Sequence, residues 1–158
     1  MKKVFIFLLS IFYSQFIFSQ EKMNFDFIIT VDEKILLTLS NPKIIVRNKN
    51  NEKIDDVRVN YYPGNFSVDT EKYNELLSEA DTQFYLNFQQ YEYSKKGIQN
   101  IKNYEIELGK SWFKEQYIIL NIYNTDTKKY RKLTPLSIDK SYTFDIATSN
   151  GQMIRVKN

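Results

Sequence analysis

Gln116–Asn124, which reads Gln-Tyr-Ile-Ile-Leu-Asn-Ile-Tyr-Asn, is the stretch that decides the fold class of this chain. Three apolar residues, Ile118, Leu120 and Ile122, would share one face of an extended chain, while the residues between them are mixed in polarity. This two-residue period, carried by β-branched and aromatic side chains, predicts a strand. One wholly apolar face and one mixed face predict a central strand with one side in a core.

The same alternation recurs along the rest of the chain, between turn signals such as Asn48–Glu52 and Tyr62–Asn65. The expected strands centre on residues 24–31, 34–39, 44–46, 57–60, 82–94, 104–108, 128–133, 142–146 and 153–156. Lys and Arg residues in 128–132 would protect an exposed sheet edge from unwanted pairing. Short strands at roughly ten-residue spacing predict an all-β, mostly antiparallel β-sandwich.

One segment outside the N-terminal run has helical spacing, with apolar residues Tyr73, Leu76, Leu77 and Ala80. Asp69 or Thr70 can cap its free N–H groups. The spacing predicts one short helix at about 70–80 whose apolar stripe lies on a sheet. An α+β roll, with this helix packed on one sheet, is the alternative to the sandwich.

The segment from Leu136 to Ile146, followed by Asn150-Gly151, resembles the last two strands of immunoglobulin-like and fibronectin type III domains. The resemblance covers about 20 residues and implies an immunoglobulin-like form of the sandwich. It makes Tyr142 a candidate tyrosine corner, with its hydroxyl bonded to the backbone a few residues upstream. Ile138 departs from the pattern, because type III domains usually carry proline there.

The N-terminus has the pattern of a secretory signal. Lys2 and Lys3 precede an apolar run at 4–18, and a small residue, Ser19, ends it. The run of about 15 residues suits a signal peptide, whereas a membrane span needs about 20. We expect 1–19 to be a signal peptide cleaved at 19/20, leaving 20–158 as a single domain with no transmembrane span. An uncleaved anchor is the alternative.

Charge does not predict binding to nucleic acid. The chain has 22 basic and 19 acidic side chains. Cleavage of the signal removes Lys2 and Lys3, which leaves 20 basic against 19 acidic residues. A nearly neutral domain lacks the basic surface that nucleic acids require.

The absence of both cysteine and histidine excludes several chemistries. Ser-His-Asp and Cys-His nucleophilic sites, Cys/His zinc sites and haem ligation by histidine all need these residues. No cofactor or metal site is predicted, because a calcium site through Asn124 and Asp126 lacks the spacing of a known loop. A hydrolase would have to use carboxylates alone, and Asp126, Asp139 and Asp145 could meet only through the fold.

Aromatic residues are the candidate binding groups. Tyr85, Tyr91 and Tyr93 share one face of the expected strand 82–94, with amide side chains between them. Tyrosine rings beside amides can stack on sugar rings and bond their hydroxyls. Trp112 is the only tryptophan and directly precedes the central strand. These four residues form the predicted ligand site; the alternative is that they brace the sheet or plug the core.

Together these patterns predict an exported, non-catalytic binding module of a bacterial cell envelope, in the periplasm or outside the cell. Its ligand would be a glycan or an envelope protein. A structural or assembly protein of an envelope complex is the first alternative, and a carboxylate-only hydrolase is the second.

Overall fold

The structure, a computed structural model, describes residues 21–78, 81–93, 99–151 and 153–155. The predicted signal peptide at 1–19 lies outside these residues. Within them, no helix combines the length and the apolar character that crossing a membrane requires.

The described part of the chain is mostly β with one short α-helix, as predicted. The elements in order are β1 (Lys22–Val31), β2 (Lys34–Ile35), β3 (Ser40–Arg47), β4 (Lys53–Tyr62), β5 (Asn65–Asp69), α2 (Thr70–Ser78), β6 (Gln83–Tyr93), β7 (Gln99–Leu108), the 3₁₀ helix η1 (Lys110–Lys114), β8 (Tyr117–Asn124), β9 (Tyr142–Thr148) and β10 (Met153–Arg155).

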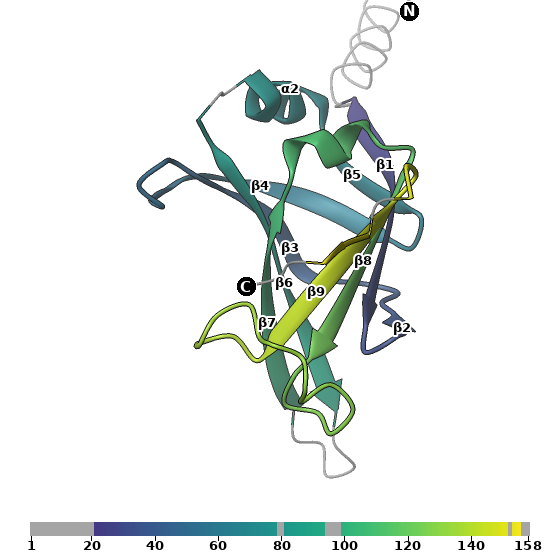
Figure 1. Ribbon diagram of the computed structural model, residues 1–158. Helices are drawn as coiled ribbons and strands as arrows, with labels where there is room; N and C mark the ends of the chain where they lie inside the picture. The colour runs from purple at the N-terminus through teal and green to yellow at the C-terminus, as the bar shows by residue number, and fades with distance from the viewer. Residues whose placement is uncertain (1–20, 79–80, 94–98, 152, 156–158) are drawn as a thin grey trace, which may run out of the picture.

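The described strands form one curled sheet, a half-barrel, rather than two stacked layers (Figure 1). Their order is β10-β9-β8-β1-β5-β4-β3-β6-β7, and the short β2 pairs with β1. The first half of β1 pairs antiparallel with β5, and the second half pairs parallel with β8. The predicted two-sheet sandwich and its immunoglobulin-like form are therefore not confirmed, because β1 joins all the strands into a continuous sheet.

The core fills the inside of the curl, where the predicted alternation holds. Ile118, Leu120 and Ile122 of β8 are at most 2% exposed. On β6, Phe84 and Leu86 are equally buried, and so is the next inward residue, Phe88. β8 lies between β1 and β9, so the stretch quoted first is the central strand that its pattern predicted.

The helix closes one end of the curl, against β1 and β5 (Figure 1). Asp69 caps it, since its Oδ1 accepts hydrogen bonds from the backbone N–H groups of Glu71 and Lys72. Tyr73 and Phe25 have ring centroids 5.3 Å apart, and Phe25 packs on Phe113 at 5.2 Å. This aromatic cluster connects α2 and η1 to β1.

The basic segment at 128–133 is not a strand, which corrects the sequence prediction. Its backbone forms successive turns, with the N–H groups of Tyr130 and Arg131 both donating to the carbonyl of Thr127. These local hydrogen bonds compete with sheet pairing. The segment from 125 to 141 is therefore a long loop between β8 and β9.

Gly109, just before η1, lies directly under the indole of Trp112. A Cβ at this position would lie 2.8 Å from the Cε2 and Nε1 atoms of the indole. Gly109→Ala should therefore displace the ring, shift the emission of the single tryptophan and lower the free energy of unfolding by about 1 kcal/mol. Ser111→Ala is the matched control, because Ser111 is exposed and its replacement by alanine adds no atom against the ring. Identical emission spectra for wild type and Gly109→Ala would contradict this packing.

Candidate functional site

One side chain connects the two sides of the half-barrel. β7 ends the sheet, and the hydroxyl of Tyr142 on β9 binds the backbone of Glu105 on β7. This hydroxyl accepts a hydrogen bond from the Glu105 N–H at 2.7 Å and donates one to the Glu105 carbonyl at 2.9 Å. A single phenol thus makes the two bonds that a neighbouring strand would make.

The tyrosine-corner prediction for Tyr142 was wrong about which backbone residue the hydroxyl binds. The hydroxyl does bind the backbone, but 37 residues upstream on another strand rather than a few residues upstream. Tyr142 is 4% exposed, and burial raises its pKa to about 12, against the lowering effect of its bond to the Glu105 backbone. The phenol therefore stays protonated, as the bond it donates requires.

Ion pairs reinforce this closure. The Glu105 carboxylate lies 2.9 Å from the Arg47 guanidinium and 3.6 Å from the Lys140 ammonium. Lys140 also donates to the Glu105 carbonyl at 3.3 Å. All three side chains are less than 26% exposed, so both pairs are stronger than surface pairs: Lys140 holds the loop before β9 against β7, and Arg47 connects Glu105 to β3.

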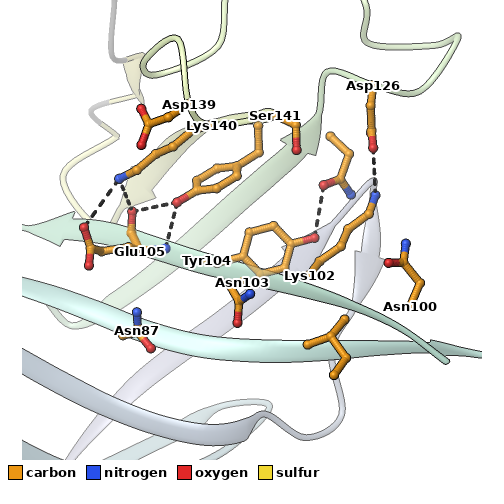
Figure 2. Close-up of a pocket in the computed structure, with 13 residues that line it drawn as sticks. Asn87, Asn100, Lys102, Asn103, Tyr104, Glu105, Asp126, Asp139, Lys140 and Ser141 are labelled. Carbon is orange, nitrogen blue, oxygen red and sulfur yellow. Dashed lines mark hydrogen bonds and ion pairs between the residues drawn. The ribbon is translucent and has the colours of Figure 1, made fainter.

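A polar cavity of about 520 Å³ lies on one side of the closure, and we name it the edge groove (Figure 2). One wall is β7 from Asn100 to Glu105, together with Asn87 of β6. The other wall comes from the end of β8 and the loop after it, including Asp126, Asp139 and Ser141. Amide and charged groups thus dominate the lining.

Two connections fix the far wall of this groove. Lys102, whose side chain is 16% exposed, lies 3.4 Å from Asp126 and 3.6 Å from Glu92. Asn124 is 1% exposed and accepts a hydrogen bond from the Tyr104 hydroxyl at 3.1 Å. The end of β8 and the loop after it are therefore each bonded to β7 at one point (Figure 2).

A second cavity of about 350 Å³ lies on the other side of the closure, and we name it the aromatic hollow. Four of its lining residues supply rings or an aliphatic side chain: Tyr85, Trp112, Leu136 and Phe144. Its polar groups come from Glu105, Glu107, Ser137 and Lys140. The hollow therefore combines apolar walls with a few hydrogen-bonding groups, which is the usual make-up of a small-molecule site.

The aromatic hollow brings together two of the four predicted site residues, Tyr85 and Trp112. The Arg47 guanidinium lies 4.8 Å from the centroid of the Tyr85 ring, and the Tyr85 hydroxyl lies 3.1 Å from Gln83 Oε1. Burial, followed by the charge of Glu107, raises the pKa of Tyr85. The ring is therefore held in a fixed position and remains neutral.

The other two predicted residues do not join them. Tyr91 shares a face of β6 with Tyr85, but six residues of extended strand separate them by about 20 Å. The Tyr91 hydroxyl donates to Gln89 at 3.3 Å, and its ring lines neither cavity. The side chain of Tyr93 lies outside the part of the chain that the structure describes. The described residues thus form a compact hollow rather than a long tyrosine platform.

Three carboxylates line the edge groove: Glu105, Asp126 and Asp139. The first two are in ion pairs with lysine. The hydroxyl of Ser137 donates to Asp139 at 2.5 Å, and this bond lowers the pKa of Asp139. A general acid needs the opposite shift, so the bond from Ser137 does not prepare Asp139 to donate a proton at neutral pH.

Asp145 lies apart from the acidic side chains of the edge groove. Asp145 is buried away from both cavities, where it accepts hydrogen bonds from Asn121 at 2.8 Å and Tyr123 at 3.1 Å. Among the described residues, no group of three or more acidic side chains could hold a metal ion.

Sequence reasoning missed several residues of the two cavities, above all Leu136, Phe144, Glu105 and Lys140. Phe144 belongs to a predicted strand, so its alternation indicated burial but not a position beside a cavity. Leu136 and Lys140 lie in the loop before β9, where no periodicity exists to place them.

Comparisons of the chain with protein-family models, with curated proteins and with solved structures found no match.

Proposed function

We propose that this chain is an exported, non-catalytic binding module of a bacterial cell envelope, and that the aromatic hollow binds a glycan. The observation that carries the proposal is the convergence of Tyr85 and Trp112, from β6 and η1, on one cavity. Aromatic faces stack on the apolar faces of sugar rings, and nearby carboxylates, hydroxyls and ammonium groups bond sugar hydroxyls.

The volume of the aromatic hollow favours a small ligand, and its ion pairs allow that ligand to be uncharged. A cavity of about 350 Å³ is near the lower end of the range for small-molecule sites. It suits one or two sugar units rather than a long stretch of polymer. Glu105 is neutralised by Arg47 and Lys140, so the hollow does not require a charged ligand. Export follows from the residues at 1–19, which have the pattern of a signal peptide.

A glycan array tests the proposal with wild type, Trp112→Ala, Tyr85→Ala and Tyr91→Ala. We expect the first two variants to lose about tenfold or more in affinity for the glycans that wild type binds, because each loses one stacking face. Tyr91→Ala should bind within about twofold of wild type. It removes the same side chain from the same face of β6, but away from the hollow.

Two results would contradict the glycan site: no glycan bound by wild type, or equal loss of binding in all three variants. Titration of the single tryptophan with the bound glycans provides an independent measurement. Its emission should change on saturation, because Trp112 lines the hollow.

A carboxylate hydrolase is less well supported by this arrangement. In the edge groove, Glu105 and Asp126 form ion pairs with lysine, and the bond from Ser137 lowers the pKa of Asp139. Retaining and inverting glycosidases both need one protonated carboxyl group.

A further inference from the structure

We propose that the edge groove is a docking site for an extended polypeptide segment, which pairs with β7 as an additional strand. This inference goes beyond the glycan site, because it depends on the backbone of β7 and not on the aromatic hollow. It identifies the partner as a protein with an unpaired, extended segment, or the exposed terminus of one.

The direction of the β7 backbone carries the first step. The N–H and carbonyl of Glu105 point away from β6, since both bond the Tyr142 hydroxyl. In an antiparallel pair this direction alternates, so Asn103 and Ile101 present their N–H and carbonyl groups on the same side. Among the described residues, β7 pairs only with β6, and no turn, loop or side-chain group bonds the main chain of Asn103 or Ile101 from the other side. They form an open template for a further strand.

The space beside this edge carries the second step. The edge groove runs along Asn100 to Glu105, a length of roughly 17 Å in an extended chain. Its opposite wall, with Asp126, Asp139 and Ser141, would enclose an added strand (Figure 2). The Tyr142 hydroxyl already makes at Glu105 the two bonds that a neighbouring strand would make, so the edge of β7 is open to such bonds. Because the phenol occupies Glu105, the added strand would end there.

The walls of the edge groove favour a single extended segment over a second copy of this chain. Asp126, Asp139 and Ser141 of the loop from 125 to 141 face β7 across the groove, so two copies pairing through β7 would have to fit both of these loops beside the edge. A single extended segment has no such obstacle. Its main-chain groups repeat every two residues, about 6.7 Å, which matches the spacing of the free groups of Ile101 and Asn103.

Charge indicates the kind of segment. Lys102 and Lys140 are already paired with acidic residues. Asp139 lines the groove without an ion pair among the described residues. The groove therefore favours a segment that carries a lysine or arginine. The mode of recognition is strand addition, in which main-chain bonds supply affinity and side-chain contacts supply selectivity.

Selection of random displayed dodecapeptides on the purified chain tests this proposal. We expect enriched peptides that contain a basic residue and bind Asn103→Pro at least tenfold more weakly than wild type. Proline removes the outward N–H without removing a bond to β6, and edge strands tolerate it there. Asn103→Ala is the matched control: it keeps the N–H, loses the same side chain, and should bind within about threefold of wild type.

Methylation of peptide amides provides a second test that leaves the protein unchanged, should Asn103→Pro unfold by circular dichroism. Methylating one alternate set of amides in an enriched peptide should abolish binding, and methylating the other set should have little effect. Failure to enrich any peptide, equal binding to Asn103→Pro, or equal effects of the two methylated sets would each overturn the proposal. A wild-type dimer that Asn103→Pro disrupts would also overturn it, because the partner would then be a second copy. None of these results bears on glycan binding, which is measured separately.

Discussion

Replacing Asn124 by alanine is expected to lower the free energy of unfolding by about 3 kcal/mol. Asn124 is the last residue of β8, and its side chain connects three segments. Its Nδ2 donates to Asp32 Oδ2 at 2.8 Å, and its Oδ1 accepts from the Tyr104 hydroxyl at 3.1 Å. Alanine would leave Asp32 Oδ2 without its amide donor, in a site that is 1% exposed at Asn124. Asp32 Oδ1 would keep the backbone N–H of residue 124 at 2.8 Å, and the Tyr104 hydroxyl would keep Gln90 Oε1 at 3.1 Å, so the cost falls mainly on the carboxylate. Bonds to charged groups are the costlier ones to lose.

Urea denaturation measures this effect, with Asn100→Ala as the control. Asn100 is exposed, and its side chain donates only to Glu92 at 3.3 Å among the described residues. Its loss should change the free energy of unfolding by less than about 0.5 kcal/mol. A loss below about 1 kcal/mol in Asn124→Ala would show that the connection between β8, β7 and the turn at Asp32 contributes little to stability.

Tyr142→Phe should lower the free energy of unfolding by about 2 kcal/mol at neutral pH. The substitution keeps the ring, which packs on Tyr104 at 5.1 Å, and removes both bonds to Glu105. The Glu105 N–H would then lose the partner that closes the half-barrel. Lys140 would still donate to the Glu105 carbonyl, which limits the cost.

The pH dependence of this difference follows from the raised pKa of Tyr142. Its pKa is about 12 in the folded chain and near the ordinary value of 10 in the unfolded chain. Its contribution is therefore complete below pH 10 and is lost as the pH rises through 12. Wild type should lose stability over this range, and its advantage over Tyr142→Phe should shrink. Tyr104, whose pKa is also raised by burial, makes some alkaline loss common to both proteins. A constant difference from pH 7 to pH 12 would contradict this account.

Local patterns predicted most of the strands, the buried faces and the helix cap, because each depends on neighbours within a few residues, but they placed a strand at 128–133 and missed β5. The alternation of Ile118, Leu120 and Ile122 is a property of an extended chain with one face in a core, whatever the partner strands are. Asp69 caps α2 for an equally local reason, since its carboxylate reaches N–H groups two and three residues away.

The arrangement of the strands could not be predicted in the same way. Apolar alternation on β1 is compatible with a sandwich and with a half-barrel. The choice depends on its parallel pairing with β8 and antiparallel pairing with β5. The Tyr142 hydroxyl likewise binds a strand 37 residues away, and nothing in the adjacent sequence specifies that partner.

The candidate site was predicted in its residue types and only partly in its geometry. Tyr85 and Trp112 were selected as aromatic residues near the sheet, and their convergence depends on η1 and on the close approach that Gly109 allows. Tyr91 has the same pattern in sequence but lies too far along β6. The free groups of Ile101 and Asn103 leave no trace in sequence, because they belong to the backbone.

Amide hydrogen exchange along β7, followed by NMR on the unliganded protein, tests the central claim most directly. That claim is that the sheet ends at β7 and meets β9 through one phenol. We predict fast exchange at Ile101 and Asn103, slow exchange at Lys102 and Tyr104, and protection at Glu105 that Tyr142→Phe removes. Uniformly slow exchange from 101 to 105 would contradict the claim, because it would require a partner for the whole edge of β7.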